Sequence, residues 1–63
     1  MTQTEFMGLP AGTIISATWR DGSGRGDYTV RRAIDGKNAI FYGSTWVGNF
    51  VDAVKIDIVR LAK

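Results

Sequence analysis

Alternation of apolar and polar side chains with a period of two constrains this chain more than any other feature of its sequence. In TIISATWRD, residues 13–21, Ile15, Ala17 and Trp19 share one parity, and the residues between them are polar. Successive side chains of a β-strand point to opposite faces, so this pattern predicts a strand with one buried face.

A second alternating stretch, DYTVRRAID, covers residues 27–35. Tyr28, Val30 and Ile34 share its apolar face, which predicts a second half-buried strand. Arg32 breaks the alternation. This break indicates a bulge, or a side chain that reaches past the edge of the core.

The residues between these strands, DGSGRGDY at 21–28, predict a hairpin turn. Glycines at 22, 24 and 26 tolerate the positive φ angles that such a turn needs, and they place Arg25 at its tip. The segment lacks the lysine and the Ser or Thr of a phosphate-binding loop. The tripeptide Arg-Gly-Asp at 25–27 could act as an adhesion motif only on a secreted protein, and nothing in the sequence indicates secretion. A turn is therefore the preferred interpretation.

A second turn is predicted at DGKN, residues 35–38, and a third strand at AIFYGSTW, residues 39–46. This strand is apolar on both faces at residues 40–42, which is typical of a central strand, and Gly43 predicts a curve in it.

The C-terminal segment, residues 45–63, fits two structures. As a helix it has an apolar stripe at 3–4 spacing, formed by Val47, Val51, Val54, Ile58 and Leu61. As a strand, VKIDI alternates strictly, and one bulge near Val59 continues the pattern. The β-branched residues of the segment favour the strand.

The N-terminal residues, 1–11, are predicted to form an arm that precedes the main domain at 12–63. Thr2 and Glu5 match a capping box, which predicts one turn of helix before Pro10, with a frayed arm as the alternative. The stretch has no basic lead and no long apolar run, so neither a signal peptide nor a membrane anchor is expected.

Four or five short strands in this length predict a mainly β fold, a small closed antiparallel barrel, because closure removes exposed strand edges. The alternative is a three-stranded sheet with a C-terminal helix. The run ATWRDG…YTVRRAIDG…AIFYG…VKIDIVRL resembles the Tudor and SH3-like small barrels over residues 12–61. It is also similar to the C-terminal barrel of retroviral integrases, which binds DNA. Ser44 and Thr45 stand where Tudor domains usually carry an acidic residue, so the resemblance implies the fold more than the reading of methylated lysine or arginine.

Composition argues against catalysis and for binding. The 63 residues include no cysteine and no histidine, so disulfides, thiolate metal sites and the usual general base are absent. Aspartates in loops more often form turns than metal sites. We therefore expect a cytoplasmic protein that is not an enzyme and that binds no metal and no cofactor. A chain this short has a small core, which makes homo-oligomers a further expectation.

The predicted function is nucleic-acid binding, to DNA first, through a basic hairpin edge. Arginine suits phosphate oxygens and base edges, and aromatic side chains between arginines stack on bases. The net charge of +2 favours an anionic partner. The predicted site consists of Arg20, Arg25, Tyr28, Arg31, Arg32, Lys37 and Tyr42.

The alternative is a protein-interaction module, a small regulator or inhibitor that docks on a larger protein. Its predicted contact residues are Trp46, Val47 and Phe50, in an apolar loop, or an exposed edge strand. The opposing interpretation is that this loop caps the open end of the barrel. We also expect at least two of Trp19, Phe41 and Trp46 to be buried, because a short chain needs its large side chains inside.

Overall fold

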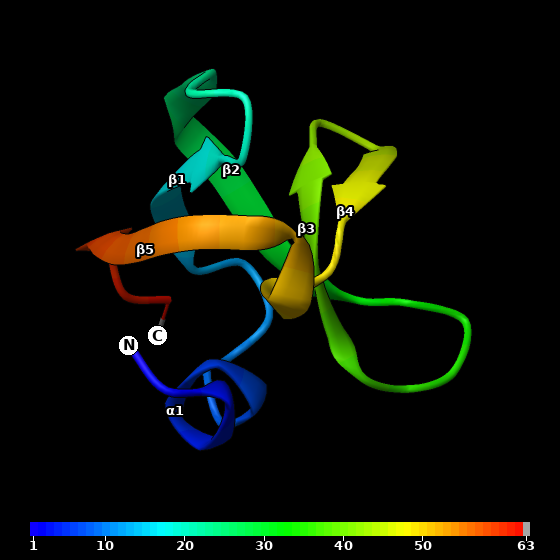
Figure 1. Ribbon diagram of the computed structural model, residues 1–63. Helices are drawn as coiled ribbons and strands as arrows, with labels where there is room; N and C mark the ends of the chain where they lie inside the picture. Colours follow the sequence, from blue (N-terminus) through cyan, green and yellow to red (C-terminus); the bar gives the residue numbers. More distant parts are fainter. Residues whose placement is uncertain (63) are drawn as a thin grey trace.

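The computed structural model describes residues 1–62, and one antiparallel sheet of five strands dominates it, in the order β4-β3-β2-β1-β5 (Figure 1). The elements are α1 (Gln3–Met7), β1 (Ile14–Trp19), β2 (Gly24–Arg32), β3 (Asn38–Tyr42), β4 (Thr45–Gly48), the 3-10 turn η1 (Phe50–Asp52) and β5 (Ala53–Arg60). The mainly β prediction is therefore confirmed. Strands β4 and β5 are the two edges of an open sheet, so the predicted closure into a barrel is not confirmed.

The hairpin between β1 and β2 has a shorter turn than predicted. The ladder continues to Thr18 opposite Gly24, and the backbone N–H of Trp19 donates to the Ser23 carbonyl at 2.7 Å. Arg25 therefore lies in β2 and not at the tip of the turn. Only Gly22 of the three glycines has a positive φ, of 87°.

The bulge of β2 lies between the turn and its buried half, not at Arg32. Ile15 pairs with Tyr28 but Ala17 pairs with Arg25, so β2 contains one extra residue at this point. Arg32 pairs in register with Asn38 at the end of β2.

The prediction that Ile34 shares the buried face of a strand is wrong. Strand β2 ends at Arg32, and the following turn closes through a bond from the Ala33 N–H to the Lys37 carbonyl at 2.8 Å. The Lys37 N–H also donates to Asp35 Oδ1 at 2.9 Å. These bonds hold Ile34 outside the ladder, where its side chain is fully exposed.

Residues 39–46 form two strands and not one curved strand. Gly43 has a φ of 63° and begins the turn between β3 and β4, after which Thr45 pairs with Tyr42 and Trp46 with Phe41. Gly43, in the left-handed conformation, reverses the direction of the chain, whereas the sequence predicted only a curve within one strand.

The strand interpretation of the C-terminal segment is correct for residues 53–60, and the alternative with a C-terminal helix is wrong. Ile15 pairs with Ile58 while Ile14 pairs with Arg60, so the extra residue is Val59, where a bulge was predicted. β5 is an edge strand with a second bulge at Val54, and only Ile56 of its apolar residues is buried.

The N-terminal segment packs against the core of the sheet, and Figure 1 shows α1 below β5, at one end of the strands. The predicted capping box of Thr2 and Glu5 is present, so the helix interpretation is confirmed. Phe6 is fully buried, and its ring lies 5.4 Å from that of Phe50. The side-chain amide of Asn38 donates to the carbonyls of Phe6 and Leu9, both at 2.9 Å, and so fixes the segment to β3. Within residues 1–62, no helix has the length and apolar character to cross a membrane.

Candidate nucleic-acid interface

The seven residues predicted to bind nucleic acid occupy several parts of the structure. Arg25, Tyr28 and Tyr42 meet on the concave face, and Arg31 lies on the opposite face of the sheet. Arg32 and Lys37 belong to the end of β2 and the turn after it, and Arg20 follows β1. The seven residues therefore do not form one continuous hairpin edge.

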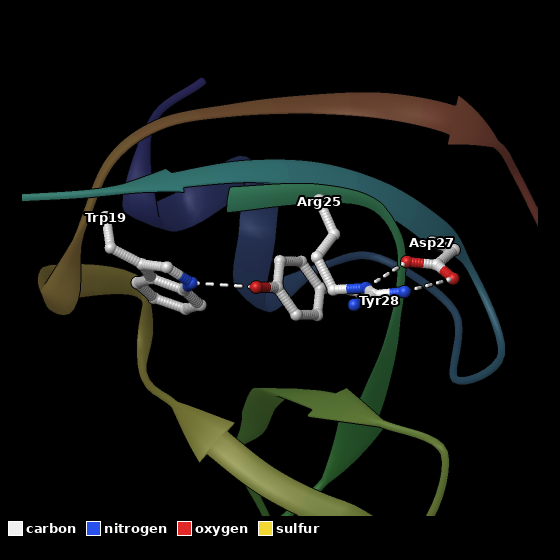
Figure 2. A network of polar contacts seen from close by, with 4 residues as sticks. All are labelled: Trp19, Arg25, Asp27 and Tyr28. Carbon is white, nitrogen blue, oxygen red and sulfur yellow. Dashed lines mark hydrogen bonds and ion pairs between the residues drawn. The ribbon is translucent and has the colours of Figure 1, made fainter. Parts of the chain in front are cut away.

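Arg25 stacks on an aromatic ring. Its guanidinium carbon lies 4.1 Å from the centre of the Tyr42 ring, and Tyr42 is 45% exposed. Tyr28 meets Tyr42 edge to face with 6.4 Å between ring centres, and it accepts a hydrogen bond from Trp19 Nε1 at 2.8 Å (Figure 2). Tyr28 is itself buried, so it supports Tyr42 and offers no face to a ligand.

The Arg25 charge has a carboxylate partner. Arg25 Nε lies 2.8 Å from Asp27 Oδ1 (Figure 2), and both side chains are exposed. Arg25 and Asp27 are two positions apart in β2, and the bulge lies between Arg25 and Tyr28. The hydrogen bond lowers the pKa of Asp27 and raises the pKa of Arg25, because it favours the charged form of each group.

The lowered pKa of Asp27 gives a direct test of this pair. We expect the Asp27 carboxyl to titrate below its usual range, and Arg25→Gln to raise its pKa toward that range, as measured by carboxyl carbon NMR. Because the pKa in the fold is lowered, the stabilisation is present above the unfolded pKa and is lost as the pH falls through the folded pKa. A titration unchanged by Arg25→Gln would show that the two side chains do not pair in solution.

Arg31 forms a second stack on the convex face of the sheet. Its guanidinium carbon lies 5.4 Å from the centre of the Phe41 ring, and Nη1 donates to the Gly43 carbonyl at 3.4 Å. Within the described residues Arg31 forms no ion pair. A shallow depression of about 610 Å³ lies beside it, with Thr29, Arg32 and Gly43 in its lining.

The strand register extends this second stack into a row across the whole sheet. Directly paired residues of antiparallel strands project to the same face. The successive pairs align Arg60, Ile14, Thr29, Phe41 and Trp46. Trp46 is 52% exposed and Arg60 is exposed, so the row has an aromatic end and a basic end.

The two arginine–aromatic stacks, Arg25 on Tyr42 and Arg31 on Phe41, flank one turn. Phe41 and Tyr42 are consecutive residues of β3, so their rings point to opposite faces of the sheet. Both precede Gly43 at the tip of the β3–β4 hairpin. Each side of this hairpin therefore has an aromatic ring of β3 with an arginine of β2 stacked on it.

Two of the other predicted cations form hydrogen bonds to carbonyls of loops and turns. Arg20 Nη2 donates to the Val51 carbonyl at 3.2 Å, and Arg32 Nη1 donates to the Gly36 carbonyl at 3.3 Å. Lys37 is exposed in the same turn as Gly36. These three residues do not join either stack. The predicted site also left out Arg60 and Phe41, whose positions in one row follow only from the strand register.

The three residues predicted for protein docking also lie in two different places. Trp46 and Val47 are exposed on the edge strand β4, and Val47 is the extra residue of a bulge. Phe50 instead packs against Phe6 over the core. Phe50 thus acts as a cap of the apolar interior.

No group of three or more acidic, histidine or cysteine side chains suited to a metal ion occurs among residues 1–62. Comparisons with protein-family models, with curated proteins and with solved structures gave no match. Function is therefore inferred from the geometry of the stacks and of the strand edges.

Proposed function

We propose that this chain is a non-catalytic protein that binds nucleic acid through the two arginine–aromatic stacks of the β3–β4 hairpin. The observation that supports the proposal best is Arg31, an exposed arginine without an ion pair, stacked on Phe41 in a row that ends at the exposed Trp46. A stacked guanidinium keeps its N–H groups in a fixed plane, ready for phosphate oxygens.

Single-stranded DNA fits this surface better than a duplex. The exposed ring of Trp46 is suited to stack on a base, and bases offer their faces only when they are unpaired. Arg25 and Arg31 on the two sides of the hairpin would contact the phosphates. The net charge of +2 is small, so the affinity is expected to depend on these local contacts and on salt.

Removal of the two stacked charges tests the proposal. We expect Arg25→Gln and Arg31→Gln to weaken binding of a short single-stranded DNA by roughly tenfold each, because each change removes a phosphate contact. The slope of log affinity against log salt should fall by about 0.7 per arginine. Fluorescence anisotropy at several salt concentrations measures both quantities.

Arg20→Gln is the matched control, because it removes the same charge from a side chain that lies apart from both stacks. It should reduce affinity by a small electrostatic factor only. Equal losses for all three variants would show that binding follows total charge and not the stacks. An amide chemical-shift titration with single-stranded DNA, duplex DNA and single-stranded RNA would locate the contact, and no shift with any of them would overturn the proposal.

The exposure of Trp46 and Val47 favours a second candidate, docking on a larger protein. A protein partner would lose affinity on Trp46→Ala and keep it on Arg25→Gln. The predicted SH3-like barrel also remains a proposal, because β4 and β5 do not pair with each other to close the sheet.

A further inference from the structure

Strand β5 leaves one long edge of the sheet without a partner. Among residues 1–62 it pairs with β1 alone, along eight residues, Ala53–Arg60. The opposite edge strand, β4, has four residues and a bulge at Val47. Bulges protect an edge from further pairing, and in β5 they lie at Val54 and Val59, so the regular stretch of this edge runs from Lys55 to Ile58.

The open edge is apolar on one face and charged on the other. Ile58, on the face of the buried Ile56, is 45% exposed, and Val54, the extra residue of a bulge, is 61% exposed. Lys55 and Asp57 lie on the other face, with Lys55 Nζ 3.7 Å from Asp57 Oδ2. Charged side chains on an edge strand usually discourage pairing with another strand by repulsion. In two antiparallel copies of β5, however, Lys55 of each copy can lie opposite Asp57 of the other, so the charges attract.

We propose that a second copy of this chain pairs with β5 in antiparallel orientation, about a two-fold axis through Ile56. In this register Lys55 faces the partner's Asp57, and Ile56 faces the partner's Ile56. Both protomers then keep their cores on the same side of a continuous sheet of ten strands, two of the five-stranded sheets joined edge to edge.

The charges select this register among the neighbouring ones. An axis through Lys55 would set two lysines opposite each other, and an axis through Asp57 would set two aspartates opposite each other. An axis between two residues would place buried-face side chains opposite solvent-face ones. Only the register centred on Ile56 joins opposite charges on one face and apolar side chains on the other.

The edge is also accessible. A groove of about 210 Å³ runs along it, lined by Met1, Phe50 and residues 53–57. The lining includes consecutive β5 residues of both faces, which places the groove at the strand edge. Among residues 1–62, Met1 forms no backbone hydrogen bond to β5, so the edge remains available to a partner strand.

Charge reversal and charge exchange test the dimer. Sedimentation equilibrium from about 10 µM to about 1 mM should show a monomer–dimer equilibrium for the parent chain. Lys55→Asp and Asp57→Lys should each weaken it at least about tenfold, because the two-fold axis creates two like-charge contacts per substitution. The double variant with both substitutions restores opposite charges across the axis and should return the affinity to within about threefold of the parent.

Lys37→Asp is the matched control, since it makes the same charge change in the turn before β3 and should leave the association unchanged. Circular dichroism confirms that each variant is folded. Amide hydrogen exchange should show protection of β5 that increases with protein concentration. A parent chain that stays monomeric over the whole range, or a dimer that the single reversals leave intact, would overturn the proposal.

Discussion

Gly24→Ala is expected to unfold most of the protein at 25 °C. A Cβ atom at this position would lie 2.1 Å from the Ala17 carbonyl oxygen and 3.0 Å from Thr18 Cα. Both atoms belong to the backbone of β1, so no side-chain rotation relieves the clash, and the β1–β2 ladder must separate. We expect a loss of about 3 kcal/mol, which is comparable to the whole stability of a domain of this size.

Gly26→Ala is the control for this prediction. It lies two residues further along β2, a Cβ there meets nothing within 4 Å, and its φ is not among the positive ones. We expect it to be neutral or to stabilise the fold by about 0.5 kcal/mol, because alanine restricts the unfolded chain. Urea unfolding monitored by tryptophan fluorescence measures both variants. Equal stabilities would mean that β1 and β2 are not as close at Gly24 as the structure shows.

Phe6→Ala should cost about 3–5 kcal/mol and leave little folded protein. Phe6 is fully buried, and its ring packs on Phe50 over the open side of the sheet. Removal of a buried aromatic ring loses its transfer free energy and leaves a cavity. The change also loosens the segment whose carbonyls accept from Asn38, so these buried groups lose their partners.

Gln3→Ala is the matched control in the same helix, because Gln3 is exposed and the substitution should change stability by less than about 0.5 kcal/mol. Thermal unfolding by circular dichroism distinguishes the two variants. A melting temperature for Phe6→Ala within a few degrees of the parent would show that α1 does not belong to the core in solution.

Local patterns predicted the strands well. Side-chain alternation is a property of neighbouring residues, and it located the buried positions Ile15, Ala17, Tyr28 and Val30 without knowledge of the partners. The capping box of α1 and the bulge at Val59 are equally local, and both are present. At Ile34 the same reasoning failed, because a turn closed by two hydrogen bonds ended the strand earlier than the alternation did.

Burial of the large side chains could not be predicted from size. Trp19 and Phe41 are half-buried and Trp46 is exposed, whereas Phe6 and Tyr28 are the aromatic residues of the core. The expectation that at least two of the first three are buried is therefore wrong, because none of them is fully enclosed. Burial depends on which distant segments meet, and here the N-terminal segment covers the sheet.

The candidate site divides in the same way. The sequence by itself determined that this chain would be a small β protein with its arginines and aromatic residues interleaved along adjacent strands, because composition and period are fixed residue by residue. The tertiary structure decided which arginine stacks on which ring, that Phe41 and Trp46 share a row with Arg60, and that β5 is a free edge. These features depend on the register between strands, and a register is set by contacts between residues far apart in the chain.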